Sequence, residues 1–183
     1  MAVNVAKSET AEPALKATFG VGQQAIAFIE ALLLAVWLGS MIFFSFAVAP
    51  SAFAVLPSRE LAGAVVTSAI GKLEILGLII GPLLVLIQLT AWRARSVSAQ
   101  IKALRVILLL MMTAAAALSR FWVSAKMVSL RQAMGGVIDD VAVTDPLRIE
   151  FNALHGYSVG LMSAAMLAGF VVLFFTIRSW LKR

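Results

Sequence analysis

Residues 73–92, LEILGLIIGPLLVLIQLTAW, decide the fold class of this chain. Glu74 is the only charged side chain in this run, and the apolar residues are continuous instead of alternating. About 20 apolar residues in a helix cover the roughly 30 Å hydrocarbon core of a bilayer, whereas a membrane β-strand alternates apolar and polar residues. The stretch therefore predicts a transmembrane helix.

Three further stretches are comparably apolar. The four predicted spans are residues 24–49, which stop at Pro50, residues 61–92, residues 106–123 and residues 156–177. The composition agrees, because 62% of the 183 residues are hydrophobic and 13% are charged, against about 25% charged residues in a soluble domain. We expect an all-α, four-helix transmembrane bundle over residues 21–183, preceded by a mobile cytoplasmic tail over residues 1–20.

Two of the helices are predicted to extend past the bilayer on its outer side. If Arg93 lies at the cytoplasmic surface, about 20 residues of helix reach back to Leu73, and residues 59–71 rise beyond the outer surface. Residues 124–133 continue the third helix outward until the Gly135–Gly136 pair ends it. Residues 135–146 are then expected to form an acidic outer loop.

Charges in the connecting segments predict the orientation. Basic residues without acids occupy the segment between the second and third spans and the C-terminal tail: Arg93, Arg95, Lys102 and Arg105, then Arg178, Lys182 and Arg183. Because basic segments stay in the cytoplasm, both termini are expected to be cytoplasmic, in an inner or plasma membrane. The net charge of +6 has the same origin, so we expect the lipid bilayer, and no nucleic acid, as a partner.

The residue types exclude several chemistries. The chain has no cysteine and one histidine, His155, which rules out a disulfide, a thiolate metal site and a pair of imidazole ligands within one chain. No nucleophile elbow, phosphate-binding loop, zinc motif or paired-carboxylate spacing occurs. We therefore expect no catalytic residues, no metal ligands and no cofactor, and an enzyme is the less favoured interpretation.

Ionisable side chains near the outer ends of the spans are the candidates for function, because charges within apolar spans are costly. Lys72 and Glu74 belong to the second span, Arg120 to the third, and His155 precedes the fourth. Since a buried carboxylate needs a cationic partner, we expect Glu74 to pair with Arg120. This predicts an outward-facing polar vestibule for an ion or small polar ligand, with His155 able to relay protons. The alternative is interfacial snorkelling plus one structural ion pair.

Two other patterns have structural explanations. Glu30 lies near the cytoplasmic start of the first span, where an interfacial carboxylate is favoured over a proton-carrying group. Met162 is four residues from Met166 and seven from His155, a spacing that would suit Cu(I). Methionine is also ordinary filling for an apolar bundle, so we assign no metal ligand.

Glycine spacing predicts close helix packing. Gly77 and Gly81 form a GxxxG pattern in the second span, and Gly156 and Gly160 form another in the fourth. Such pairs let helix backbones approach closely within a membrane, and Pro82 is expected to kink the second helix near its middle. The same faces would serve contacts within the bundle, in a homo-oligomer or in a larger membrane complex.

Two segments carry a family resemblance. The first is WLGSMIFF at residues 37–44, followed by Pro50, Phe53 and Pro57; the second is FNALHGYS at residues 151–158. Together they resemble the transmembrane protein 205-like family, a largely uncharacterised family of four-span proteins. More remotely, the chain is similar to copper-resistance D and HemJ-type membrane proteins. The matching motif positions are Gly39, Pro50, Phe53, Pro57, His155, Gly156 and Ser158.

The resemblance implies the four-span fold but assigns no chemistry to these positions. Many relatives carry an asparagine where this chain has Met162, so a polar site built on that asparagine would be altered or absent. Pro50 and Pro57 are expected to fix the turn between the first two helices. Ser158 and His155 are expected at the outer level of Glu74.

The predicted function is binding or translocation of a small ligand or ion at that outer level. One alternative is an accessory subunit of a larger membrane complex. A less favoured alternative is a haem or redox protein that takes ligands from another chain.

Overall fold

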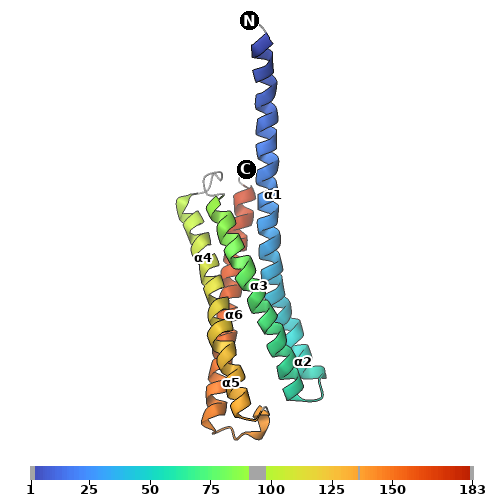
Figure 1. Ribbon diagram of the computed structural model, residues 1–183, viewed down its shortest axis with the longest axis vertical. Coiled ribbons are helices and arrows are strands. Elements are labelled where there is room, and N and C mark those ends of the chain that lie inside the picture. The colour runs from blue at the N-terminus through green and yellow to red at the C-terminus, as the bar shows by residue number, and fades with distance from the viewer. Residues whose placement is uncertain (1–2, 91–97, 136, 182–183) are drawn as a thin grey trace.

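The computed structural model describes residues 3–90, 98–135 and 137–181, with side chains described from residue 21 to residue 179 of those ranges. Every element in the described part is helical (Figure 1). Their order is α1 (Val3–Phe43), the π-helical turn η1 (Phe44–Val48), α2 (Ala49–Val55), α3 (Arg59–Thr90), α4 (Ala99–Leu118), the π-helical turn η2 (Ser119–Ser124), α5 (Ala125–Ala133), the 3-10 turn η3 (Ile138–Asp140) and α6 (Pro146–Leu181).

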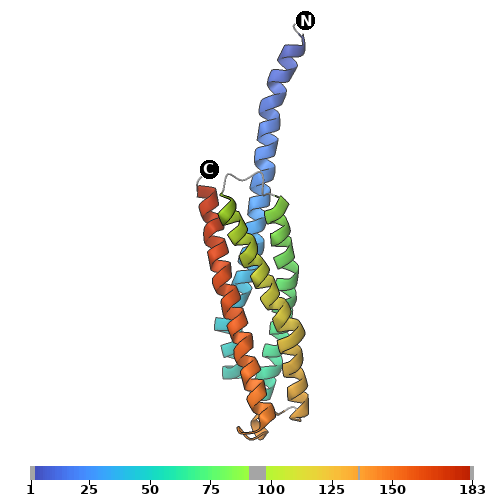
Figure 2. The ribbon, with the colours of Figure 1, turned by 90° about the vertical axis from the view of Figure 1, so that its left-hand side faces the viewer.

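These elements form a bundle of four long helices that lie side by side in both views (Figures 1 and 2). The stretches long and apolar enough to cross a membrane are Val21–Val55, Arg59–Thr90, Ala99–Ala133 and Pro146–Ser179. We call the end with Thr90, Ala99 and the C-terminus the proximal end, and the opposite end the distal end. The all-helical, four-helix prediction is confirmed. The segment before residue 21 continues α1 as a helix beyond the proximal end, and its mobility stays a prediction.

The first helix does not stop at Pro50, as the sequence suggested, but continues to Val55. Proline lacks an N–H group and its ring collides with the carbonyl four residues earlier in a regular helix. Here the π turn η1 intervenes, with the N–H of Ala49 donating to the carbonyl of Phe44. Pro50 therefore falls in the first turn of α2, where a helix needs no N–H donor.

The turn between α2 and α3 forms at Pro57, as expected. Leu56 is extended, with φ −75° and ψ 143°, because the ring of a following proline disfavours the helical conformation. The hydroxyl of Ser58 then accepts a hydrogen bond from the N–H of Leu61 at 3.2 Å, which caps the start of α3. The helix begins at Arg59, in agreement with the predicted extension over residues 59–71.

The third and fourth helices begin earlier than the apolar runs indicate. The α4 helix starts at Ala99, capped by Ser98, and α6 starts at Pro146, where Asp145 Oδ1 accepts from the N–H of Leu147 at 2.8 Å. An apolar run marks only the length of helix that fits the hydrocarbon of a membrane, whereas caps mark where the helix ends. The predicted continuation of the helix through α5 is confirmed, and Gly135 follows its end with φ +79°; that this end faces outward stays a prediction.

Two apolar cores fill the bundle. The central core joins all four long helices, with Leu34, Leu38, Leu84, Leu109 and Val172 among its fully or nearly fully buried members. The distal core joins η2, α5 and the start of α6, through Val123, Leu130, Met134, Phe151 and Leu154. The two cores explain why the helices can be longer than a bilayer requires. The distal core packs together the helix segments that extend past the central core.

Ion pairs at the distal end involve the predicted acidic loop. Asp139 lies 3.8 Å from Nη1 of Arg59 and 3.5 Å from Nη2 of Arg148. Glu150 lies 3.3 Å from Nζ of Lys126, on α5. These partly exposed pairs link α3, α5, the loop and α6, although each exposed pair contributes only about 0–1 kcal/mol.

One of the two GxxxG pairs lies in a close helix contact. A Cβ on Gly77 would lie 3.0 Å from Nε1 of Trp37, and a Cβ on Gly81 would overlap the hydroxyl of Thr113 and lie 3.1 Å from its Cβ. The pair thus brings α3 against both α1 and α4. Gly156 and Gly160 have nothing within 4 Å of such a Cβ, so this pair faces away from the bundle.

Gly81→Ala is expected to destabilise the protein by about 1–3 kcal/mol, because the added methyl must displace the β-branched side chain of Thr113. Gly160→Ala is the matched control, since its methyl meets open space, and its cost is expected below about 0.5 kcal/mol. Thermal unfolding in detergent, followed by tryptophan fluorescence, measures both. Equal stability of the two variants would contradict the close α3–α4 contact.

Candidate functional site

Charged side chains border an apolar band of the bundle surface at two levels, and further charges lie beyond it at the distal end. Lys72, Arg120 and His155 are exposed near the distal level, and Arg178 is exposed near the proximal level, together with the half-buried Lys102. From Lys102 to Arg120, α4 and η2 cover about 27 Å at 1.5 Å per residue, close to the roughly 30 Å of bilayer hydrocarbon. The exposed large side chains of α4 between these levels are apolar: Leu104, Ile107, Leu110, Met111 and Leu118.

Glu74 lies inside this band, about 3 Å along the helix axis from the level of Lys72. Its side chain is 5% exposed, and its Oε1 accepts hydrogen bonds from the hydroxyls of Ser119 at 2.6 Å and Ser124 at 2.7 Å. Its other oxygen, Oε2, is buried and has no hydrogen-bond partner among the described residues. One oxygen of this carboxyl is thus fully engaged and the other is available.

The π turn η2 explains how both serines reach one oxygen atom. In a regular α-helix, at 100° per residue, side chains five positions apart point about 140° away from each other. A π turn closes its hydrogen bonds between residues i and i+5, which brings such side chains onto one face. Ser119 and Ser124 are the two ends of η2, and both therefore face Glu74.

A cavity of about 40 Å³ lies between the four helices beside this carboxyl. Its polar lining consists of Glu74, Ser119, Ser158 and the indole of Trp37, and the remainder is apolar, including Met41, Met112 and Met162. A water needs about 10–15 Å³ on this measure, so the space accommodates about three to four waters. Ser158 is 6% exposed, and its hydroxyl forms no hydrogen bond among the described residues.

The expected vestibule is only partly assembled. Glu74 and Ser158, from α3 and α6, line one cavity, whereas Lys72, Arg120 and His155 are exposed outside it. The expected ion pair between Glu74 and Arg120 is wrong, because no such pair occurs among the described residues. Arg120 follows Ser119 and so points about 100° away from it; its Nη1 lies 3.6 Å from where a Cβ of Gly71 would be.

Most of the motif residues of the family resemblance also lie outside the cavity. Ser158 lines it, whereas the other positions are exposed on the bundle: Gly39, Pro50, Phe53, Pro57, His155 and Gly156. The proline positions shape the α2–α3 region, and Gly39 and Gly156 have no atom within 4 Å of an added Cβ. Sequence reasoning missed Ser119 and Ser124, whose approach to Glu74 depends on a π turn that no residue pattern in the chain indicates.

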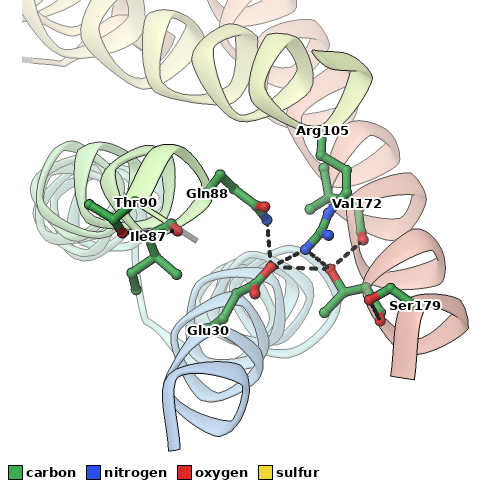
Figure 3. Close-up of polar contacts among 8 residues, drawn as sticks. Glu30, Ile87, Gln88, Thr90, Arg105, Val172 and Ser179 are labelled. Atoms are coloured by element: carbon green, nitrogen blue, oxygen red, sulfur yellow. Dashed lines mark hydrogen bonds and ion pairs between the residues drawn. The ribbon is translucent and has the colours of Figure 1, made fainter. Parts of the chain in front are cut away.

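A second buried polar cluster joins all four long helices two to three residues inside the proximal level (Figure 3). Glu30 of α1 accepts, on Oε1, from Nε2 of Gln88 of α3 at 2.5 Å, from Nη2 of Arg105 of α4, and from Oγ1 of Thr176 of α6 at 3.5 Å. Arg105 Nη2 also donates to Thr176 Oγ1 at 2.9 Å. Glu30 is 1% exposed and Arg105 0% exposed. We call these four residues the proximal network.

The proximal network corrects two predictions. Glu30 was expected at the interface, and Arg105 was counted among the basic charges of a loop, yet they form a fully buried ion pair. The cause is the early start of α4, which puts Arg105 inside the helix instead of ahead of it. Glu30 and Arg105 carry opposite charges at the same predicted level of the first and third spans, which was a signal for this contact. Spacing alone, however, does not show which helix faces are neighbours.

The two polar centres differ in how their charges are compensated. The proximal network pairs a carboxylate with a guanidinium, while the described part of the chain offers Glu74 two hydroxyls and no cation. Among the described residues no group of three or more histidine, cysteine, aspartate or glutamate side chains is placed to hold a metal ion. The Glu74 cavity can therefore accept a small ligand, whereas the proximal network links helices.

Fold and site thus define a four-helix protein of membrane-spanning helix length, with two buried ionisable centres. The chain belongs to a family described as a domain of unknown function (DUF4149), whose model matches residues 32–135, more than half of the chain. That region includes Glu74, Gln88 and Arg105, while Glu30, Ser158 and Thr176 lie outside it. The match does not support the narrower resemblance to the transmembrane protein 205-like, copper-resistance D or HemJ-type proteins. No curated protein and no solved structure matches the chain.

Breaking the buried ion pair is expected to cost about 3–5 kcal/mol of stability, because Glu30→Gln or Arg105→Gln leaves the other charge buried without its partner. The double variant Glu30→Leu/Arg105→Met is expected to recover at least half of that loss, since no charge remains to be buried. Thermal unfolding in detergent measures each variant, with exposed Arg120→Gln as control. Single variants as stable as the control would contradict the buried pair.

Deletion of one residue tests the π turn. Removing the exposed Phe121 from η2 is expected to cost no more than about 1 kcal/mol, because the turn closes to a regular α-helix and both flanks keep their faces. Ser119 and Ser124 then stand four positions apart, still on one face. Removing the exposed Leu110 from α4 instead rotates the rest of the helix by about 100° and is expected to prevent folding. Thermal unfolding in detergent again gives the readout, and equal effects of the two deletions would contradict the role assigned to η2.

Proposed function

We propose that this chain is a multi-pass protein of the inner or plasma membrane that binds a small ligand in the Glu74 cavity, reached from the distal end. The observation that carries the proposal is the buried Oε2 atom of Glu74, which has no hydrogen-bond partner among the described residues and belongs to a side chain lining a cavity. Burying a polar group without a partner costs about 1–3 kcal/mol, more for a charge. A ligand in the cavity would offset that cost.

The position of the cavity supports access from the distal end. Glu74 lies about 3 Å along the helix axis from the level of the exposed Lys72, close to the distal edge of the apolar band. Toward the proximal end, the buried residues of the central core are apolar over about 20 Å between Glu74 and Gln88, and the proximal network follows. The described conformation therefore supports binding from one side better than an open channel, and translocation would require the helices to separate.

The orientation completes the proposal. Basic segments at the proximal end would place both termini in the cytoplasm by the charge rule, so that the cavity faces the outer side of the membrane. Membership in the transmembrane protein 205-like family would fit this topology but would add no chemistry to the cavity.

One observation supports a second candidate function, that of an accessory subunit. Gly156 and Gly160 are exposed and unpacked on α6, and small-residue pairs are typical of helix contacts in membranes. A homo-oligomer or a larger complex would bury this face. A stoichiometric complex after mild-detergent extraction that is lost in Gly160→Leu would favour this function; the haem alternative has no comparable support.

Sided labelling of single cysteines tests access to the cavity, since the natural chain contains no cysteine. In sealed vesicles, Ser158→Cys is expected to react slowly with a membrane-impermeant thiol reagent added on the distal side and not at all from the proximal side. Exposed Gly156→Cys marks the distal side, and Ala168→Cys in the central core serves as the unreactive control. Reaction of Ser158→Cys only from the proximal side, or from neither side, would overturn the proposal.

A further inference from the structure

We infer that the ligand of the Glu74 cavity is a monovalent cation, stripped of most of its water and held between the free oxygen of Glu74 and the hydroxyl of Ser158. The inference rests on the proposed function and names its ligand class. Glu74 and Ser158 come from α3 and α6 and line the same cavity, yet no hydrogen bond joins them among the described residues. The space between these two oxygen-bearing groups is the place for the ion.

The charge of the cavity favours a single positive charge. Glu74 is the only ionisable residue in the lining, and the distal cations Lys72 and Arg120 are exposed outside it. A carboxylate buried without a counter-charge costs several kcal/mol, and one monovalent cation neutralises it. A divalent ion would leave one positive charge buried, and Ca²⁺ takes six to eight oxygen ligands, usually with several carboxylates.

The hydrogen bonds around Glu74 leave an acceptor atom available in the cavity, whereas its lining contains no positively charged group. Ser119 and Ser124 both donate to Oε1, which orients the carboxyl and leaves Oε2 as an available ligand atom. Ser158 adds a hydroxyl oxygen, and such hard oxygen atoms suit alkali cations better than soft ones. Glu74 and Ser158 would thus bind the ion, while Ser119 and Ser124 position the carboxyl.

The size of the cavity limits the ion and its remaining shell. A volume of about 40 Å³ corresponds to about three to four water positions, enough for an alkali or ammonium ion with one or two waters. A fully hydrated ion or an extended organic cation does not fit. The ion must therefore exchange most of its water for the oxygen atoms of Glu74 and Ser158.

Thermal unfolding of the purified full chain in detergent tests the inference with the chloride salts of Li⁺, Na⁺, K⁺ and NH₄⁺. Choline chloride at equal ionic strength is the reference, because choline is too large for the cavity. At about 100 times its Kd, at least one of the four ions is expected to raise Tm by about 5 °C. Ser158→Ala is expected to raise the apparent Kd about tenfold, Glu74→Gln to abolish the shift, and Arg120→Gln to leave it unchanged.

Several outcomes would overturn the inference. The first is the absence of a Tm shift with all four ions, and the second is a larger shift with Mg²⁺ or Ca²⁺. The third is a shift with Ag⁺ alone, which would assign the cavity to the thioethers of Met41, Met112 and Met162. The fourth is a shift that Ser158→Ala leaves intact. If Glu74→Gln does not fold, the Ser158→Ala arm still decides. Labelling of Ser158→Cys from the distal side without any ion-dependent shift would leave the proposed function standing and reject the cation.

Discussion

The arrangement of the four helices depends on the ion pair between Glu30 and Arg105. Apolar contacts alone define helix register poorly in a membrane, because lipid chains are as apolar as the side chains of the core. A buried carboxylate, in contrast, tolerates few positions of its cationic partner, since separating the charges leaves each of them unsatisfied. Gln88 and Thr176 extend the pair to the remaining two helices. We interpret the proximal network as the contact that selects one register for all four.

The two buried glutamates show how partners, and not residue type, decide the role of a charge. Glu30 has a guanidinium, an amide and a hydroxyl around one oxygen, and it is 1% exposed. Glu74 has two hydroxyls on one oxygen and a cavity beside the side chain. The first arrangement joins helices, whereas the second leaves one carboxylate oxygen without a hydrogen-bond partner among the described residues. The apolar core between them separates the two polar levels of the bundle.

Backbone irregularities connect the helices to these sites. The turn η1 lets a helix continue through Pro50, and η2 turns Ser119 and Ser124 toward the same carboxyl. Neither turn ends a helix, so each long helix keeps its length across the apolar band. π turns occur often at functional sites, and here η2 is the element that shapes the surroundings of Glu74.

The sequence by itself determined that the helices are apolar enough to cross a membrane, how many long helices there are, and much of their extent. Continuous apolar runs, Pro57 and Gly135 are local signals, and local signals suffice for these features. The early starts of α4 and α6, next to the caps Ser98 and Asp145, were not predicted. The sequence also drew attention to Glu74, because an ionisable residue in an apolar run is costly wherever it lies, and to Ser158 as a position of the family-resemblance motif. Only the tertiary structure decided the partners: that Arg105 meets Glu30, that Arg120 misses Glu74, and that Gly81 packs while Gly160 does not. Those outcomes depend on the relative rotation and depth of four separate helices, which are set by contacts between residues up to 146 positions apart in the chain.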